Sequence, residues 1–227
     1  MGEMPETLVD RTVALIGLIV LSPILLAIGA VIRLTSRGPA LFLQERVGRD
    51  GCPFRIVKFR TMTVAPPDRD GMQLTVGGDR RITPIGAFLR RFKLDEIPQL
   101  VNVLRGDMRL VGPRPEVPRY VAQYGSAQRE TLAFAPGMTD VASLYYRSES
   151  EELAEQPDPE AYYLNVILPR KIELNRRYLV ERTFWGDITI ILLTALVAVS
   201  PGWGARHVRH RVGRRYLSDG GVYDTPP

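Results

Sequence analysis

The chain has 227 residues and a mass of 25.5 kDa, which fits one domain, or a smaller domain with a membrane element, and excludes two large domains. Its formal net charge of +5 favours anionic partners such as phosphates, nucleic acid or acidic lipid. The single cysteine, Cys52, excludes an intramolecular disulfide and a multi-cysteine zinc site. Both histidines, His207 and His210, lie near the C-terminus, so the rest of the chain is left with carboxylates, Lys, Tyr and Arg for chemistry.

The first predicted element is an uncharged apolar segment from Thr12 to Ile32. As a helix rising about 1.5 Å per residue, it is long enough to cross the hydrocarbon core of a bilayer. Ser22-Pro23 at its centre predicts a kink or a break, because proline lacks a backbone donor and clashes with the preceding turn. A kinked transmembrane span and a re-entrant hairpin both remain open. The basic residues that follow place the downstream part in the cytoplasm: Arg33, Arg37, Arg46 and Arg49.

A β-hairpin and a polar loop are expected next. Ala40–Val47 and Phe54–Thr61 alternate apolar and polar residues on either side of a glycine-bounded turn, as the strands of a hairpin do. Thr63–Arg81 is polar and rich in Gly, Pro and Asp, which predicts a loop that could lie over an active site.

The remainder of the chain is predominantly helical in pattern. Helical periodicity begins at Pro84, and a good helix start at Asp158-Pro159-Glu160 continues to about Arg182 with an interruption at Pro169. Trp185–Val199 is apolar but too short to span a membrane, so it is expected to be a core or interfacial helix. The residues after Pro201 are expected to form a solvated basic tail, suited either to acidic lipid or to no defined ligand.

Two adjacent carboxylates, Asp95 and Glu96, lie among cations at a predicted helix N-terminus, where free backbone N–H groups favour an anion: the cations are Arg90, Arg91 and Lys93. By itself, Asp95 is more typical of an N-cap and Glu96 of a first-turn residue. Adjacent helical residues do not share a face, so a glycosidase-like pair of acids flanking a bond is disfavoured.

Downstream, the run Gly106–Glu116 holds Arg114 between two prolines, and such a restrained guanidinium is suited to clamp a diphosphate. The ordinary alternative is a surface arginine that pairs with Glu116. Lys58 and Arg60 at the end of the expected hairpin add two cations, for which strand-surface charge is the ordinary interpretation.

Together these segments resemble the bacterial sugar transferase family, the small monotopic phosphoglycosyl transferases that start glycan assembly on undecaprenyl phosphate. Four motifs in the family's order carry the resemblance, which covers most of the chain: Ser22-Pro23, Lys58–Met62, Leu94–Gln99 and Gly106–Pro115. The resemblance implies an α+β, mostly helical fold with a small β-hairpin, and a monotopic membrane protein whose N-terminal helix is broken at Ser22 and Pro23. The expected parts are a re-entrant membrane helix over residues 1–37, a cytoplasmic catalytic domain with interfacial helices over 38–200, and a basic tail over 201–227.

The resemblance also implies a ping-pong reaction. An aspartate attacks the β-phosphate of a UDP-sugar, UMP leaves, and polyprenyl phosphate takes up the sugar phosphate, with Mg²⁺ as cofactor. Carried onto this sequence, Asp95 is the nucleophile, Glu96 is a metal ligand or acid/base partner, and both carboxylates are candidate metal ligands. The expected phosphate- and substrate-binding residues are Arg114, Lys58, Arg60, Arg90 and Arg147.

The expected location is the cytoplasmic face of the cell inner membrane, in contact with membrane lipid, and a homodimer is left open. One departure concerns the loop at Pro136–Ser143, where many relatives carry Gly in place of Asp140 and Gln in place of Ser143. Because that loop is expected to contact the nucleotide or sugar, the identity of the sugar is left open.

Two other functions remain as alternatives. A non-catalytic membrane scaffold of the same fold would have no need for Asp95, Glu96 and Arg114 together. A membrane-tethered nucleic-acid-binding protein is supported only by the basic C-terminal segment, since no aromatic-rich binding motif appears, and nucleic acid is not an expected partner.

Overall fold

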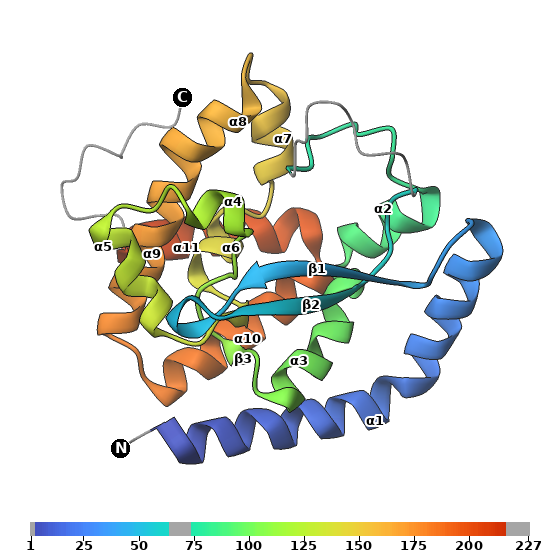
Figure 1. Ribbon diagram of the computed structural model, residues 1–227, viewed down its shortest axis with the longest axis horizontal. Helices are drawn as coiled ribbons and strands as arrows, with labels where there is room; N and C mark the ends of the chain where they lie inside the picture. Colours follow the sequence, from blue (N-terminus) through green and yellow to red (C-terminus); the bar gives the residue numbers. More distant parts are fainter. Residues whose placement is uncertain (1–2, 64–73, 217–227) are drawn as a thin grey trace.

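The computed structural model describes residues 3–63 and 74–216 (Figure 1). The helices are α1 (Glu3–Thr35), α2 (Pro84–Arg91), α3 (Leu100–Arg105), α4 (Pro118–Val121), α5 (Ser126–Arg129), α6 (Val141–Tyr145), α7 (Glu149–Ala154), α8 (Pro159–Tyr162), α9 (Leu168–Val180), α10 (Phe184–Val199) and α11 (Pro201–Tyr216). The strands are β1 (Leu41–Val47), β2 (Pro53–Phe59), β3 (Arg109–Val111) and β4 (Gly137–Thr139). The mostly helical α+β class is confirmed.

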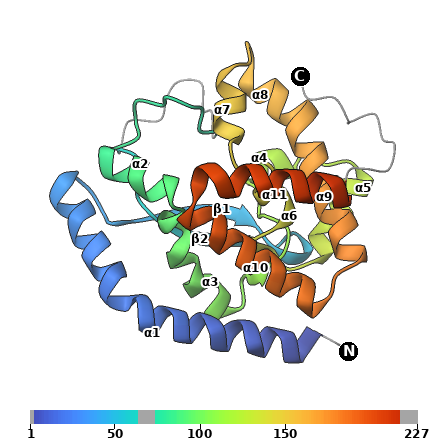
Figure 2. The ribbon, with the colours of Figure 1, turned by 180° about the vertical axis from the view of Figure 1, so that it is seen from behind.

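Helix α1 runs along the edge of the molecule and bends part-way along its length in both views (Figures 1 and 2). It remains one helix through Pro23, so the predicted break is a bend within a continuous helix. Proline at this position leaves the carbonyl of Ile19 without its usual backbone donor, and the Ser22 hydroxyl donates to that carbonyl at 2.8 Å. The Ser-Pro pair thus allows the bend while keeping the affected carbonyl hydrogen-bonded.

The two sides of α1 differ in what they meet. An apolar row at alternating spacings of four and three residues packs on α3, the hairpin and α2: Ala14, Leu18, Leu21, Leu25, Ile28 and Ile32. The opposite side is apolar as well but exposed, with Leu26 75% and Val20 66% exposed. By length and composition, Thr7–Thr35 is the one described helix that could cross a membrane.

The predicted hairpin is confirmed. Strands β1 and β2 pair antiparallel from Leu41 opposite Phe59 to Val47 opposite Pro53. The ladder extends one residue further, because the Arg60 N–H donates to the Ala40 carbonyl at 2.9 Å. The hairpin lies across one side of the domain, and α10 and α11 lie across the other (Figures 1 and 2). The predicted loop at Thr63–Arg81 falls largely on residues 64–73, outside the described residues.

A short parallel pair, β3 with β4, was not predicted from the sequence. The two strands approach so closely that a Cβ on Gly137 would lie 2.1 Å from the backbone nitrogen of Gly112. Only glycine fits at such a backbone crossing. The crossing fixes the start of the Gly112–Glu116 segment and therefore the place of Arg114.

The C-terminal helices enclose the largest core cluster. Helix α8 begins as predicted, with the Asp158 side chain accepting from the Ala161 N–H, and a π-helical turn at Tyr163–Ile167 precedes Pro169. Helix α10 buries Ile190 and Val197 while Trp185 is 75% exposed. The expected solvated tail is wrong for residues 201–216: they form α11, whose Val208, Val212 and Tyr216 are buried because they recur every fourth residue on one face. Residues 217–227 lie outside the described residues.

Candidate functional site

The two adjacent carboxylates lie in a 3-10 turn, Leu94–Gln99, between α2 and α3. The turn is entered through Lys93, whose φ of 56° places it in the left-handed region and reverses the chain direction. No side chain caps this turn at its N-terminus, so the interpretation of Asp95 as an N-cap is wrong. Both carboxylates are 8% exposed. The turn therefore brings two buried acids close together without using either as a cap.

Glu96 is held by two cations from distant parts of the chain. Arg114 donates from Nη2 to Oε1 at 2.5 Å and from Nη1 to Oε2 at 3.3 Å, and the Lys58 Nζ lies 3.0 Å from Oε1. Burial would raise the pKa of Glu96, but Arg114, Lys58 and Lys93 hold that pKa well below its ordinary value. Glu96 is therefore ionised and fixed in place.

Asp95 has the opposite environment. Its Oδ1 is buried and has no hydrogen-bond partner among the described residues. Burial, followed by the negative charge of Glu96, raises the pKa of Asp95, although Lys58, Lys93 and Arg90 partly oppose the rise. An ionised carboxylate without a hydrogen bond to one of its oxygens is poorly stabilised and correspondingly available to react or to bind a cation.

One face of the hairpin supplies the cations beneath these acids. Residues two apart on a strand point to the same side, and directly paired residues share that side, so Arg46, Lys58 and Arg60 lie on one face. Burial lowers the pKa of Lys58 to about 8, against the opposing effect of Glu96. At neutral pH this lysine is therefore charged, and a rise of about one pH unit brings it to its pKa.

A cavity of about 680 Å³ opens over these groups. Its described lining includes all of the predicted charged residues: Lys58, Arg60, Arg90, Asp95, Glu96, Arg114 and Arg147. Nine basic and four acidic side chains are among these lining residues, which gives the lining a formal net charge of +5. The formal net charge of the whole chain is also +5. The volume and the charge fit a small multiply anionic ligand. Ser22 and Pro23 are not among the lining residues and act within α1.

The predicted arginines have different surroundings within this cavity. Arg147 donates to the carbonyl of Arg91, so part of its role is to tie α6 to the end of α2. Arg60 is 5% exposed and donates to Ser36 beside the end of α1. Arg90 acts on Asp95 through charge, as one of the cations that lower its pKa.

Sequence reasoning missed Arg46 and Tyr163, which line the cavity together with Glu116. Tyr163 donates to Glu116 Oε1 at 2.6 Å, and Arg46 donates to the Pro115 carbonyl at 3.1 Å and lies 3.7 Å from Glu116 Oε2. These contacts fix the segment that carries Arg114, so Glu116 does not pair with Arg114 as the ordinary alternative had it. Hairpin register could have indicated Arg46. No local pattern distinguishes Tyr163, since it comes from a helix far along the chain.

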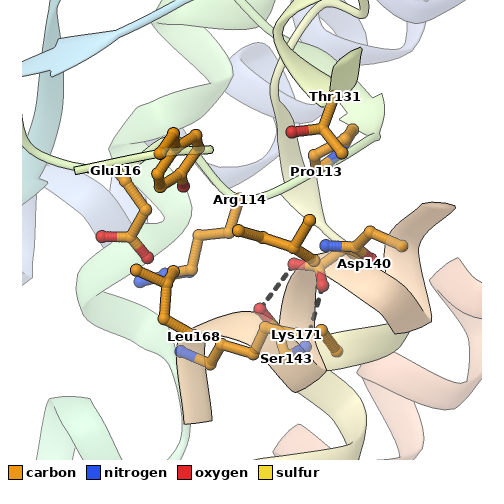
Figure 3. Close-up of a pocket in the computed structure, with 12 residues that line it drawn as sticks. Pro113, Arg114, Glu116, Thr131, Asp140, Ser143, Leu168 and Lys171 are labelled. Carbon is orange, nitrogen blue, oxygen red and sulfur yellow. Dashed lines mark hydrogen bonds between the residues drawn. The ribbon is translucent and has the colours of Figure 1, made fainter. Parts of the chain in front are cut away.

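A smaller cavity of about 30 Å³, drawn in Figure 3, shares Arg114, Glu116, Ser143 and Lys171 with the lining of the first. Asp140 there is the N-cap of α6, accepting from the Ser143 N–H at 2.9 Å and from the Ser143 hydroxyl at 2.6 Å (Figure 3). Ser143 lines both cavities, whereas Asp140 lines only the smaller one. The departure from the expected family pattern at these positions thus forms a helix cap at the cavity wall.

The acids can be tested against the Mg²⁺ that the resemblance implies. Mg²⁺ is commonly held by one or two carboxylates together with substrate phosphates. The unpaired Oδ1 of Asp95 suits such a ligand. Oε1 of Glu96 already accepts from both Lys58 and Arg114, so only Oε2, which accepts from Arg114 alone, keeps a lone pair for the ion. The described residues contain no group of three acidic, histidine or cysteine side chains placed for a metal.

Most of this chain matches a known protein family. The sequence model of the bacterial sugar transferase family matches residues 1–201. The chain belongs to this family.

Curated relatives share between a third and two fifths of the aligned residues. The UDP-glucose:undecaprenyl-phosphate glucose-1-phosphate transferase of Klebsiella pneumoniae is 38% identical over 193 residues, covering 83% of this chain and 39% of that protein. The galactosyl transferase CpsE of Streptococcus agalactiae is 36% identical over 207 residues, covering 87% of this chain and 42% of that protein. A glucose-1-phosphate transferase of Caulobacter vibrioides is 34% identical over 211 residues, covering 85% of this chain and 72% of that protein. The chain thus spans about two fifths of the first two relatives.

Proposed function

We propose that this bacterial sugar transferase moves a sugar 1-phosphate from a UDP-sugar to a polyprenyl phosphate such as undecaprenyl phosphate, and releases UMP. The observation that carries the proposal is the contrast in one turn between a carboxylate clamped by cations, Glu96, and a buried carboxylate with an unpaired oxygen, Asp95. The names of the relatives support the same donor and acceptor classes.

In the first step, a carboxylate oxygen of Asp95 attacks the β-phosphorus of the UDP-sugar. The bond from that phosphorus to the oxygen bridging the two phosphates breaks, and UMP leaves with the bond's electron pair. In the second step, a phosphate oxygen of the polyprenyl phosphate attacks the phosphorus of the aspartyl phosphosugar. The acyl phosphate bond breaks, which frees Asp95 and gives a polyprenyl diphosphate sugar.

The remaining charged residues position phosphate and offset its charge, as phosphoryl transfer requires. The two Nη hydrogen bonds to Glu96 keep Arg114 oriented, and its remaining N–H donors can bind phosphate oxygens. Lys58 adds charge next to the nucleophile and favours its ionised form. Mg²⁺, when bound, would offset charge on the donor diphosphate, with Asp95 as the protein ligand that fits it better than Glu96.

The bend in α1 is proposed to make this helix re-entrant, with both ends on the cytoplasmic face of the inner membrane. The exposed side of the helix is apolar, which suits contact with lipid. In a Cys52→Ser background, single cysteines at positions 8 and 37 should both react with an impermeant maleimide from the same side of membrane vesicles. Labelling of the two positions from opposite sides would show a spanning helix instead.

The function is tested by measuring UMP release from a panel of UDP-sugars by purified protein with Mg²⁺ and undecaprenyl phosphate. Release by the wild type that is lost in Asp95→Asn would support the proposal and identify the sugar. Full activity in Asp95→Asn would contradict the covalent mechanism. If no donor is used by either protein, the scaffold alternative becomes the better account.

A further inference from the structure

Arg60 lies at the end of the hairpin that adjoins α1, and it is the most buried of the charged residues in the cavity. Its Nη2 donates to the Ser36 carbonyl at 2.9 Å and to the Ser36 hydroxyl at 2.8 Å. Ser36 directly follows the last residue of α1, Thr35. One branch of the guanidinium is therefore fixed to the end of the apolar helix.

The other donors of Arg60 have no partner. Its Nε and Nη1 atoms are buried and make no hydrogen bond with the described residues. Unpaired buried donors are costly, and those of an ionised group more so than neutral ones. Nε and Nη1 lie on different edges of the guanidinium, so each offers a single N–H donor to an anion oxygen. A side chain held in this state, in the lining of a cavity, is suited to receive an anion.

The spacing of Arg60 from Lys58 separates this position from the Asp95–Glu96 turn. The two side chains are two residues apart along the hairpin, which places their Cα atoms roughly 7 Å apart on one face. Lys58 already contacts Glu96, whereas Arg60 contacts Ser36. The hairpin thus presents two neighbouring cations, one beside the carboxylates and one beside α1.

Apolar side chains are also among the lining residues of the cavity near Arg60. Phe42 is paired with Lys58 in the hairpin register, lines the cavity and is 46% exposed. Phe59, which directly precedes Arg60, and Met62, two residues after it, also line the cavity. A ligand that binds here would combine a phosphate with an apolar chain.

We propose that Arg60 binds the phosphate of the lipid acceptor, a polyprenyl monophosphate, while Arg114 and Lys58 bind the donor diphosphate. This inference rests on the proposed function. It divides the single cavity into a donor subsite over Glu96 and an acceptor subsite beside the end of α1. The contact with Ser36 also links the acceptor subsite to the helix expected to enter the membrane, from which a lipid phosphate would arrive.

The two half-reactions distinguish this role from a purely structural one, in which Arg60 only caps α1. UMP released from UDP-sugar without acceptor, in a burst of one per enzyme, reports the first half-reaction and the integrity of the fold. Arg60→Gln should keep that burst, while KM for the polyprenyl phosphate rises about 10- to 100-fold, as for loss of a charged hydrogen-bonded pair. Arg55→Gln, on the same strand but exposed and outside the cavity lining, is the matched control and should change neither value.

An unchanged acceptor KM in Arg60→Gln would overturn the assignment, as would loss of the burst in a folded variant. If Arg60→Gln does not fold, Arg60→Lys takes its place, because it keeps the charge but loses the guanidinium donors at Nε and Nη1. Added phosphatidylglycerol distinguishes the acceptor phosphate from an ordinary lipid headgroup. If this lipid competes with the polyprenyl phosphate as strongly as the acceptor itself does, and competes less in the variant, Arg60 binds headgroups in general and the proposal is overturned. Failure of the proposed function is distinguishable, since the wild type would then give no burst.

Discussion

The turn at Leu94–Gln99 holds two neighbouring carboxylates in opposite electrostatic environments. On one side, Glu96 accepts from Arg114 and Lys58, and its pKa is held well below its ordinary value. On the other side, Asp95 is equally buried, has an oxygen without a partner, and has a raised pKa. The comparison shows that burial does not by itself decide a carboxylate's state; the cations that reach it do. One acid organises the charge cluster, and the other remains available to react.

The largest effect is expected from Asp95→Asn. Replacing the nucleophile should lower the UMP burst at least about a thousandfold. Because the raised pKa means that the folded state disfavours the ionised carboxylate, this neutral replacement should also raise the melting temperature at pH 7. Burst kinetics and thermal unfolding measure the two effects. Asp50→Asn, at an exposed position in the hairpin turn, is the control and should change neither. A lower melting temperature in Asp95→Asn would contradict the comparison.

The opposite effect on stability is expected from Glu96→Gln. This change leaves Arg114 and Lys58 with no carboxylate, and breaking a buried ion pair on one side should cost about 3 kcal/mol. The free energy of unfolding, from denaturant titration in detergent, measures it. Glu181→Gln is the control, since Glu181 lies in an exposed pair with Arg215 at 3.8 Å and should lose less than about 1 kcal/mol. Equal losses of unfolding free energy in the two variants would show that Glu96 does not hold the charge cluster together.

The stabilising contribution of Glu96 should also depend on pH. Its pKa is depressed in the folded state, so the stability it contributes is present above the ordinary glutamate pKa and is lost as pH falls through the folded value. Thermal unfolding of the wild type should therefore lose stability in acid more steeply than Glu96→Gln does. Parallel pH dependences in the two proteins would contradict the depressed pKa.

A pH profile of the UMP burst tests the cations around Asp95. The rate should rise with pH as Asp95 loses its proton, above the range of an ordinary carboxyl group, and fall above about pH 8 as Lys58 loses its charge. In Lys58→Arg, the alkaline fall should move to higher pH because a guanidinium stays protonated. An alkaline fall at the same pH in both proteins would assign it to another group.

The smallest effect is expected from Arg90→Gln. Arg90 is among the cations that lower the pKa of Asp95. Its removal should therefore move the acidic side of the pH profile of the UMP burst to slightly higher pH. The fold and the alkaline limb should not change. A shift as large as that caused by changing Lys58 would mean that Arg90 contacts the donor directly.

Local sequence patterns predicted much of the fold. Alternation of apolar and polar residues identified the hairpin, and the Asp158-Pro159 start identified a helix, because such features depend on neighbours within a few residues. The parallel pair of β3 and β4 was not predicted, because a strand of three residues is too short to show alternation of apolar and polar residues. Helix α11 was not predicted, because its segment is strongly basic and its buried residues recur only at every fourth position.

The sequence by itself determined the kinds of groups available for chemistry: with no histidine before His207, carboxylates and cations remained, and the ordered motifs indicated Asp95, Glu96 and Arg114. The tertiary structure alone decided that Glu96 is clamped while Asp95 is free to react. It also brought Arg46, Glu116 and Tyr163 together around the segment that carries Arg114, and fixed Arg60 to the end of α1. The reason is physical. Residue types and local spacing are written along the chain, whereas the state of a buried charge depends on which distant groups the fold brings within a few ångströms of it.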